Sequence, residues 1–336
     1  MDPEPVEQLA AVEARRSTRA FWVAAWLIGG TAAIVGVPPL RAVYLDVWNA
    51  SAFAPIALAA GTAVVALCLD LVALGWARSA ARALLFPGAS ARHDIANAVL
   101  KVSGLTWIPL SIATFGAFPL GVAIVAWIFR LGTAGPLAGL TAVQSLIAAL
   151  VIGDFFYYWY HRFMHRLRFA WQLHVYHHAA TEFTILTGRR VHLGEVIFNG
   201  IMVSVPLAIL GVRIETFFWF AVVRLVISWL HHSMADWTFG WVGTWFVFSP
   251  VGHRIHHSEA EEHWDKNFGN MFTWWDHLFK TYYRGDNVNS TVGVTENPLV
   301  GVGVVEGFTG CLWRAFSVAA DSASNNRWLM PDRPQP

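Results

Sequence analysis

Three short histidine groups are the residues of this chain whose types and spacing could do chemistry. They read H-R-F-M-H, H-V-Y-H-H and H-R-I-H-H, with histidines three or four positions apart. Residues at that spacing share one face of a helix, so each group would direct two or three imidazoles the same way. Groups that face one another could enclose one metal ion or two. The histidines are His161 and His165; His174, His177 and His178; and His253, His256 and His257.

The number of histidines indicates more than one metal ion. Thirteen of the 14 histidines follow residue 160, and His192, His231 and His232 stand between the three groups. Imidazole binds iron, copper, nickel and zinc, but a structural zinc site needs only four ligands. For a single H-x-x-x-H pair, histidines on a polar rim at a membrane surface are as good an explanation as a metal site. Two H-x-x-H-H repeats together with H-x-x-x-H favour a dinuclear site.

Composition predicts an integral membrane protein. Hydrophobic residues make up 56% of the chain and charged residues 13%, with a mean hydropathy of +0.46. Soluble proteins carry about 25% charged residues. The 18 Trp and 7 Tyr are types that favour the membrane–water boundary. The net charge of +1 and the lack of a basic stripe give no indication of a nucleic-acid partner.

The apolar stretches predict an all-α fold with about four transmembrane helices and a short helical hairpin. A spanning helix needs ~20 apolar residues. The stretch from Glu195 to Leu230 is broken around Gly211, so we expect a hairpin with passes of about 17 residues, or roughly 26 Å each. The four longer candidates are Phe21–Leu40, Phe53–Trp76, Leu105–Leu131 and Pro136–Tyr160.

The distribution of arginine and lysine predicts the orientation. Positive residues cluster before the first candidate helix, between the second and third, and after the fourth. Because positive loops stay inside, both termini and a histidine-rich helical cap should be cytoplasmic. The expected regions are a cytoplasmic segment 1–20, a transmembrane region 21–153, a catalytic region 154–285, and a tail 286–336 with an interfacial helix and then disorder.

The histidine groups and their surroundings resemble the fatty acid hydroxylase / sterol desaturase superfamily of membrane di-iron enzymes. The resemblance covers about Asp154 to Tyr283 and implies two iron ions, molecular oxygen and an external reductase, cytochrome or ferredoxin. The implied reaction is hydroxylation or desaturation of an unactivated C–H bond in a lipid, such as a fatty acyl chain or sterol. The matching segments are D-F-F-Y-Y-W-Y-H-R-F-M-H, L-H-V-Y-H-H, R-V-H-L-G-E, S-P-V-G-H-R-I-H-H-S, D-K-N-F-G-N and W-W-D-H-L-F-K-T-Y-Y.

The resemblance also implies a ligand set. The third family box often reads H-x-x-x-H, whereas His231 and His232 are adjacent here, and we expect His232 to be the ligand. Asp154 lies in an apolar segment seven residues before His161, and we expect it to support a ligand through the outer ring N–H. Other available carboxylates are Glu195, Asp236, Asp265 and Asp276. The expected ligands are His161, His165, His174, His177, His178, His192, His232, His253, His256 and His257.

Two other functions and two single residues stay open at this point. Ether-lipid cleavage of the alkylglycerol monooxygenase kind fits D-K-N-F-G-N and W-D-H-L-F as well as hydroxylation does. A non-enzymatic histidine-rich membrane metal-binding protein would carry its histidines through the spanning helices, and here they cluster outside them. Arg224, inside the apolar hairpin, either snorkels to the interface or holds a lipid head group. His93 is expected in a loop.

Overall fold

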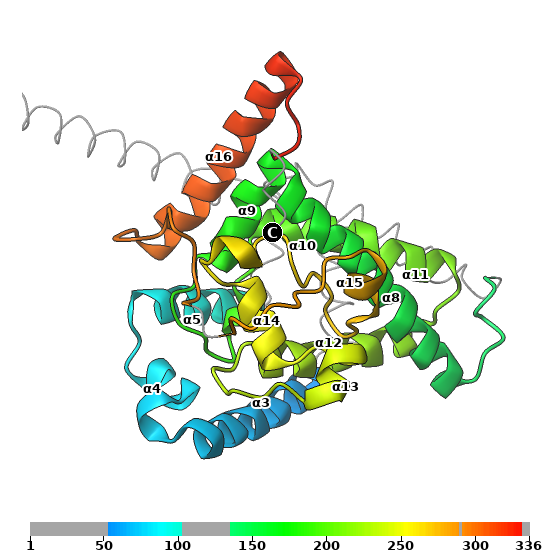
Figure 1. Ribbon diagram of the computed structural model, residues 1–336. Helices are drawn as coiled ribbons and strands as arrows, with labels where there is room; N and C mark the ends of the chain where they lie inside the picture. Colours follow the sequence, from blue (N-terminus) through cyan, green and yellow to red (C-terminus); the bar gives the residue numbers. More distant parts are fainter. Residues whose placement is uncertain (1–52, 103–134, 289–290, 331–336) are drawn as a thin grey trace, which may run out of the picture.

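The computed structural model describes residues 53–102, 135–288 and 291–330, and this part of the chain is helical without strands (Figure 1). The all-α prediction is confirmed there. The predicted segment 1–20 and the predicted spans 21–40 and 105–131 lie outside the described residues. The helices are α3 (Phe53–Leu74), η1 (Trp76–Arg78), α4 (Ala80–Leu85), α5 (Ala89–Val102), α8 (Ala142–Arg166), α9 (Arg168–His178), η3 (Thr187–Arg189), α10 (Leu193–Asn199), η4 (Gly200–Ser204), α11 (Val205–Ile209), α12 (Ile214–His231), α13 (Gly240–Trp245), α14 (Pro250–His256), η5 (Glu261–His263), α15 (Trp274–Leu278) and α16 (Val304–Asn325).

Helix α8 is the long apolar helix that ends in the first histidine group. Thr141 caps its start, because the Thr141 side chain accepts from Gln144 N and the Gln144 side chain accepts from Thr141 N. This cap places the start six residues after the predicted one. The helix has 25 residues, or roughly 38 Å at 1.5 Å per residue. Among the described helices it alone is long and apolar enough to cross a membrane.

The predicted helical hairpin is present in the structure. Its first arm runs through α10, the π-helical turn η4 and α11, and its second arm is α12. Gly211 joins the arms with φ 88°, a conformation that favours glycine. The Phe220 ring of α12 fills the space over Gly153 of α8, where a Cβ would lie 2.5 Å from that ring. The hairpin therefore packs tightly along the apolar half of α8.

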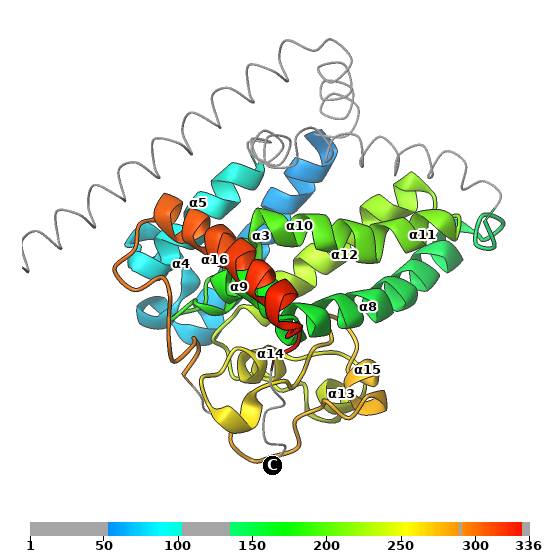
Figure 2. The ribbon, with the colours of Figure 1, turned by 90° about the horizontal axis from the view of Figure 1, so that it is seen from above.

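Helix α3 packs on another side of α12, and α4 connects it to α5, which packs on η3 (Figure 2). Asp70, the acid within the second predicted span, is buried and accepts from Ala80 N at 2.6 Å and from Ser233 Oγ at 2.7 Å. It thereby ties α3 to the start of α4 and to the end of α12. An acid inside an apolar helix is thus explained by a packing role.

Helix α16 lies along α9. Cys311 and Ala315 are buried in this contact. The tail was expected to be disordered from Asp321, but the structure continues the helix to Asn325, and Arg168 pairs with Asp321 at 2.9 Å. Short helices α13, α14 and α15 with their connecting loops close the structure below α8 and α9 in Figure 2.

Candidate dinuclear metal site

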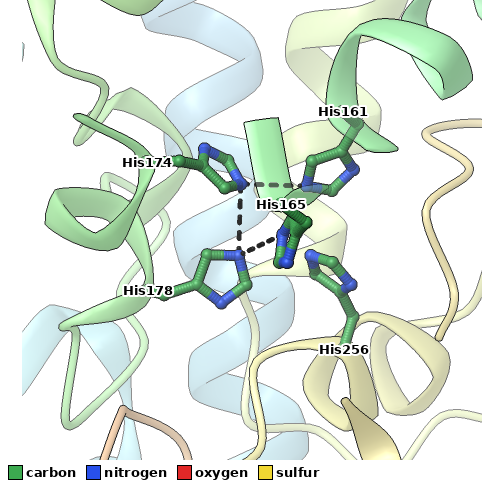
Figure 3. A group of neighbouring side chains, drawn as sticks. All are labelled: His161, His165, His174, His178 and His256. Atoms are coloured by element: carbon green, nitrogen blue, oxygen red, sulfur yellow. Dashed lines mark hydrogen bonds between the residues drawn. The ribbon is translucent and has the colours of Figure 1, made fainter. Parts of the chain in front are cut away.

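Nine buried histidines form two adjacent groups. Within each group one nitrogen of every ring lies within 4.8 Å of the others. The stacked rings of His178 and His257, with centroids 4.1 Å apart, join one group to the other. Figure 3 shows the first group, whose imidazoles converge on one centre. The five-histidine group is His161, His165, His174, His178 and His256, and the four-histidine group is His177, His232, His253 and His257.

The bend between α8 and α9 builds most of the five-histidine group. A single extended residue, Leu167, separates the two helices, so the histidines at the end of α8 face those of α9. Two pairs meet across the bend, each 13 residues apart in sequence. The Nε2 atoms of His161 and His174 are 3.1 Å apart, as are those of His165 and His178.

Helix α14 supplies histidines to both groups. Ser249 and Pro250 begin this helix, and the Ser249 side chain accepts from Gly252 N. His256 completes the five-histidine group, whereas His253 and His257 belong to the other. The Nε2 atom of His253 lies 3.1 Å from that of His232, the residue that follows α12.

Hydrogen bonds to the outer ring nitrogens determine where the protons lie. His161 Nδ1 donates to Phe268 O at 2.8 Å and His256 Nδ1 donates to Lys266 O at 2.8 Å. His174 Nδ1 faces Glu195 Oε2 at 2.6 Å. A neutral imidazole carries one proton, so Nε2 of each ring has only a lone pair. Nε2 of His232 likewise has only a lone pair, because its Nδ1 donates to Ser228 O at 2.7 Å.

These lone pairs fit metal ions better than they fit one another. Nε2 of His161 and Nε2 of His174 face each other at 3.1 Å without a proton between them. Imidazole nitrogens lie roughly 2.0–2.1 Å from a bound ion, so neighbouring ligands of one ion are about 3 Å apart. Within the described residues, His256 Nε2 and both ring nitrogens of His257 are buried without a hydrogen-bond partner, which is costly unless one nitrogen of each ring ligates a metal. The nine rings therefore fit two ions.

Burial keeps the α14 rings in the neutral form that a metal needs. It lowers the pKa of His256 to about 3. Burial, followed by repulsion from neighbouring histidines, also lowers the pKa of His253 and of His257 well below the usual value. The rings thus present lone pairs to a cation at neutral pH.

A loop between residues 266 and 272 provides the carbonyls that support His161 and His256, and two buried acids hold it. Asp276 accepts from Phe268 N at 2.8 Å and Gly269 N at 2.7 Å. Asp154 accepts from Met271 N at 2.8 Å and Phe272 N at 3.0 Å. The expectation that Asp154 supports a ligand directly is corrected, because its oxygens bind this loop and Trp275 Nε1. Glu195 is instead the acid that directly contacts a ring of the five-histidine group, at His174 Nδ1.

His192 and His231 lie outside both groups. His192 Nδ1 accepts from Gly194 N at 3.1 Å and its Nε2 donates to Phe308 O at 3.1 Å. Both nitrogens are occupied in capping α10 and holding α16, so the expectation that His192 is a ligand is also corrected. His231 Nε2 donates to Phe248 O at 3.1 Å, and His232 joins the four-histidine group as expected.

The remaining histidines lie away from both groups, and none of them is a loose surface residue. His93, expected in a loop, is buried in α5 and lies 3.2 Å from Tyr176 Oη and 3.3 Å from Val302 O. His263 is buried and donates to Asn287 O at 2.9 Å. His277 donates to Thr244 O at 2.7 Å. Each ties two segments of the chain together.

A sequence model of fatty acid hydroxylases matches residues 146–281. This segment contains all nine histidines of the two groups. Residues 146–281 therefore form a domain of the fatty acid hydroxylase superfamily. The resemblance stated from the histidine boxes is therefore confirmed. No solved structure matches the chain significantly.

Curated relatives of this chain include an ornithine lipid hydroxylase and alkylglycerol monooxygenases. An ornithine lipid hydroxylase from Rhizobium tropici is 29% identical over 229 residues, which cover 67% of this chain and 66% of the relative. Alkylglycerol monooxygenase from Homo sapiens is 24% identical over 42% of this chain and 31% of the relative. The Caenorhabditis elegans enzyme is 33% identical over 40% and 26%. The chain thus matches just under two thirds of the first relative and less than a third of the others.

Proposed function

We propose that this protein is a membrane lipid hydroxylase that uses molecular oxygen and two iron ions held by the two histidine groups. The observation that carries the proposal is the convergence of buried ring nitrogens in adjacent groups of five and four. Bound iron would supply oxygen activation, with electrons from a separate reductase, cytochrome or ferredoxin. Membership of the superfamily supports iron as the metal.

The chain's own residues hold and shield this centre. The nine imidazoles would ligate, and Glu195 and the carbonyls of Phe268, Lys266 and Ser228 fix four of the rings. All nine rings are buried, at 7% exposure or less. Such burial excludes water from a reactive centre and so limits side reactions.

Hydroxylation is the first candidate reaction, and ether-lipid cleavage the second. The match to the ornithine lipid hydroxylase extends over 67% of this chain, whereas the match to human alkylglycerol monooxygenase covers 42%. The longer match favours hydroxylation. The 33% identity to the C. elegans alkylglycerol monooxygenase over 141 residues supports ether cleavage as the second candidate. A product lipid that has lost two hydrogen atoms would instead indicate desaturation.

The membrane placement is part of the proposal. We infer a multi-pass chain with the histidine groups and both termini on the cytoplasmic side. The apolar helix α8 supports a membrane location. So do the exposed rings of Trp241, Trp245 and Trp274 on α13 and α15, a residue type that favours the membrane–water boundary.

Lipid analysis tests the function directly. Lipid extracts from cells with the active gene should contain species with one added oxygen atom that are missing from cells expressing His161→Ala. Fragmentation would locate the oxygen, and released aldehyde with free glycerol would indicate ether cleavage. Identical lipid profiles in the two strains, at equal protein levels and with an active electron donor, would refute the hydroxylase proposal.

A further inference from the structure

Three cationic residues lie on elements that pack together beside the histidine groups. They are Lys101 at the end of α5, Arg189 in η3 and Arg224 in α12. Lys101 Nζ donates to the carbonyl of Arg189 at 2.6 Å. A Cβ on Gly188 would collide with Ser228 Oγ, so η3 packs against α12 one turn beyond Arg224. The η3 turn that carries Arg189 thus packs against both α5 and α12.

The charges of this cation cluster repel one another. Burial, and then the charge of Arg224, lower the pKa of Arg189. Burial and the charge of Arg189 lower the pKa of Lys101 well below its usual value. The three residues are partly buried, and like charges that lose part of their contact with water destabilise a fold unless an anion joins them. The cluster thus has the electrostatics of an anion site.

Arg224 is linked to the five-histidine group through the Tyr157 ring. Its guanidinium lies 4.5 Å from the ring centre of Tyr157 and 5.4 Å from that of Phe220. Its Nε is buried and has no hydrogen-bond partner within the described residues. A snorkelling arginine would hold its head group in water, so a buried, unpaired Nε argues against that interpretation.

The carboxylates closest to Arg224 are already in use. Glu195 Oε2 accepts from His174 Nδ1 at 2.6 Å and from Tyr160 Oη at 3.1 Å. Both oxygens of Asp154 bind the 266–272 loop. Residues 103–134, which follow Lys101, contain no Asp or Glu. Among the described residues, the two acids whose charges reach this cluster, Glu195 at Lys101 and Asp154 at Arg224, thus already accept hydrogen bonds from other groups.

Arg190 shows what a satisfied buried arginine looks like here. It is the neighbour of Arg189 in sequence and is 1% exposed. Its Nε donates to Tyr176 O at 2.9 Å, and its Nη1 donates to Ser90 Oγ at 2.9 Å and lies 3.5 Å from Asp94 Oδ1. By contrast, Arg224 contacts two aromatic rings, and within the described residues its buried Nε has no hydrogen-bond partner.

We propose that Lys101, Arg189 and Arg224 bind an anionic oxygen group of the lipid substrate, either a carboxylate or a phosphate. Guanidinium groups pair with both in a bidentate geometry. This inference rests on the proposed hydroxylase function and names its substrate class: an acidic lipid. It adds no redox step.

The cluster also places the acidic group relative to the oxidised carbon. The Tyr157 ring lies between the Arg224 guanidinium and His161, with ring centres 5.5 Å apart on the histidine side. The distance from the Arg224 guanidinium to the centre of the His161 ring is therefore at most the sum of these two distances. The oxidised carbon should therefore lie close to the acidic group, and not at the far end of an acyl chain.

Lipid binding to the full-length, iron-loaded protein in detergent micelles without oxygen tests this site. The probes are dioleoylphosphatidic acid, oleic acid and the uncharged dioleoylglycerol, with dissociation constants measured by native mass spectrometry. At least one acid should bind about tenfold or more tightly than dioleoylglycerol, the order of effect of a hydrogen bond to a charged partner. The stronger acid tells phosphate from carboxylate.

Variants connect the preference to the cluster. Arg224→Gln and Arg189→Gln should each bring the acid and dioleoylglycerol to within about threefold of each other, whereas Arg224→Lys should retain part of the preference. Arg82→Gln removes an exposed positive charge on α4 and should keep the full preference. Equal binding of acid and neutral lipid by the wild type, or an undiminished preference in both glutamine variants, would overturn the proposal.

The two proposals fail in different ways. A chain that binds acidic lipid through these residues but forms no oxygenated product contradicts the hydroxylase function and leaves the anion site standing. A chain that oxygenates lipids but shows no preference for acids contradicts the anion site alone.

Discussion

The five-histidine and four-histidine groups differ in how firmly their rings are held. In the first, His161, His174 and His256 each engage an outer nitrogen with a fixed oxygen atom. In the second, within the described residues, only His232 does so. In the part of the chain that the structure describes, Nδ1 of His177 and Nδ1 of His253 are buried without a hydrogen-bond partner.

Outer hydrogen bonds orient ligand rings and raise their basicity. The difference therefore suggests two unequal metal positions in one site. The five-histidine group should hold its ion in a preset geometry, because its supports belong to the packed loop 266–272 and to α10. The four-histidine group has fewer supports, and its ion should exchange more readily.

Loss of a ligand from either group should have the largest effect. His174→Ala and His253→Ala should both abolish lipid oxidation, because each opens a coordination position. Each variant should retain the ion of the untouched group, which metal analysis of the purified protein would report as one iron per chain. His231→Ala is the matched control, since His231 lies outside both groups, and it should retain two.

Chelation should separate the groups in time. Supports of this kind typically change metal affinity 10–100-fold, so dialysis against a weak chelator should release one equivalent from the four-histidine group well before the second. The spectrum of a cobalt-substituted sample would follow each step. Simultaneous release of both equivalents would mean that the two groups do not differ in metal affinity, which would contradict the comparison.

Replacing Glu195 tests the support of one ring. Glu195→Gln keeps the size of the side chain but removes the charge that faces His174 Nδ1. Activity should fall about 10–100-fold, with iron lost first from the five-histidine group. Glu261→Gln, at an exposed position, should behave as the wild type. If Glu195→Gln loses iron from the four-histidine group first, the comparison is reversed.

Asp154→Asn should have a smaller effect on activity, because Asp154 acts through the 266–272 loop. An asparagine can replace one of the two oxygens that accept from Met271 N and Phe272 N. The free energy of unfolding should drop by about 1–3 kcal/mol, visible as a lower melting temperature. A loss of activity as large as that of Glu195→Gln, with unchanged stability, would point to a direct role.

Local spacing carried much of the prediction of the site. All eight histidines of H-R-F-M-H, H-V-Y-H-H and H-R-I-H-H appear in the two groups, but the expectation that each box directs its imidazoles the same way is wrong for two boxes, because His177 and His256 each join the other group from their neighbours. The helical class and the hairpin break near Gly211 followed from the lengths of the apolar stretches.

Interactions between distant residues could not be predicted from spacing. Nothing local separates His192 from a ligand, because its role depends on Phe308, 116 residues away. Asp154 was chosen for its proximity to His161 along α8, yet its partners lie 117 and 118 residues further along the chain. The capping of α10 by His192 and Glu195 is the local signal that could have marked Glu195 as fixed near the site.

Iron quantification with Mössbauer spectroscopy on the purified, iron-57-loaded protein tests the central claim most directly. Two adjacent groups with different supports predict two irons per chain and two distinct quadrupole doublets of equal area. His253→Ala should remove one doublet and leave the other. A single iron per chain in a folded wild-type protein, or no iron with the fold intact, would contradict the dinuclear site.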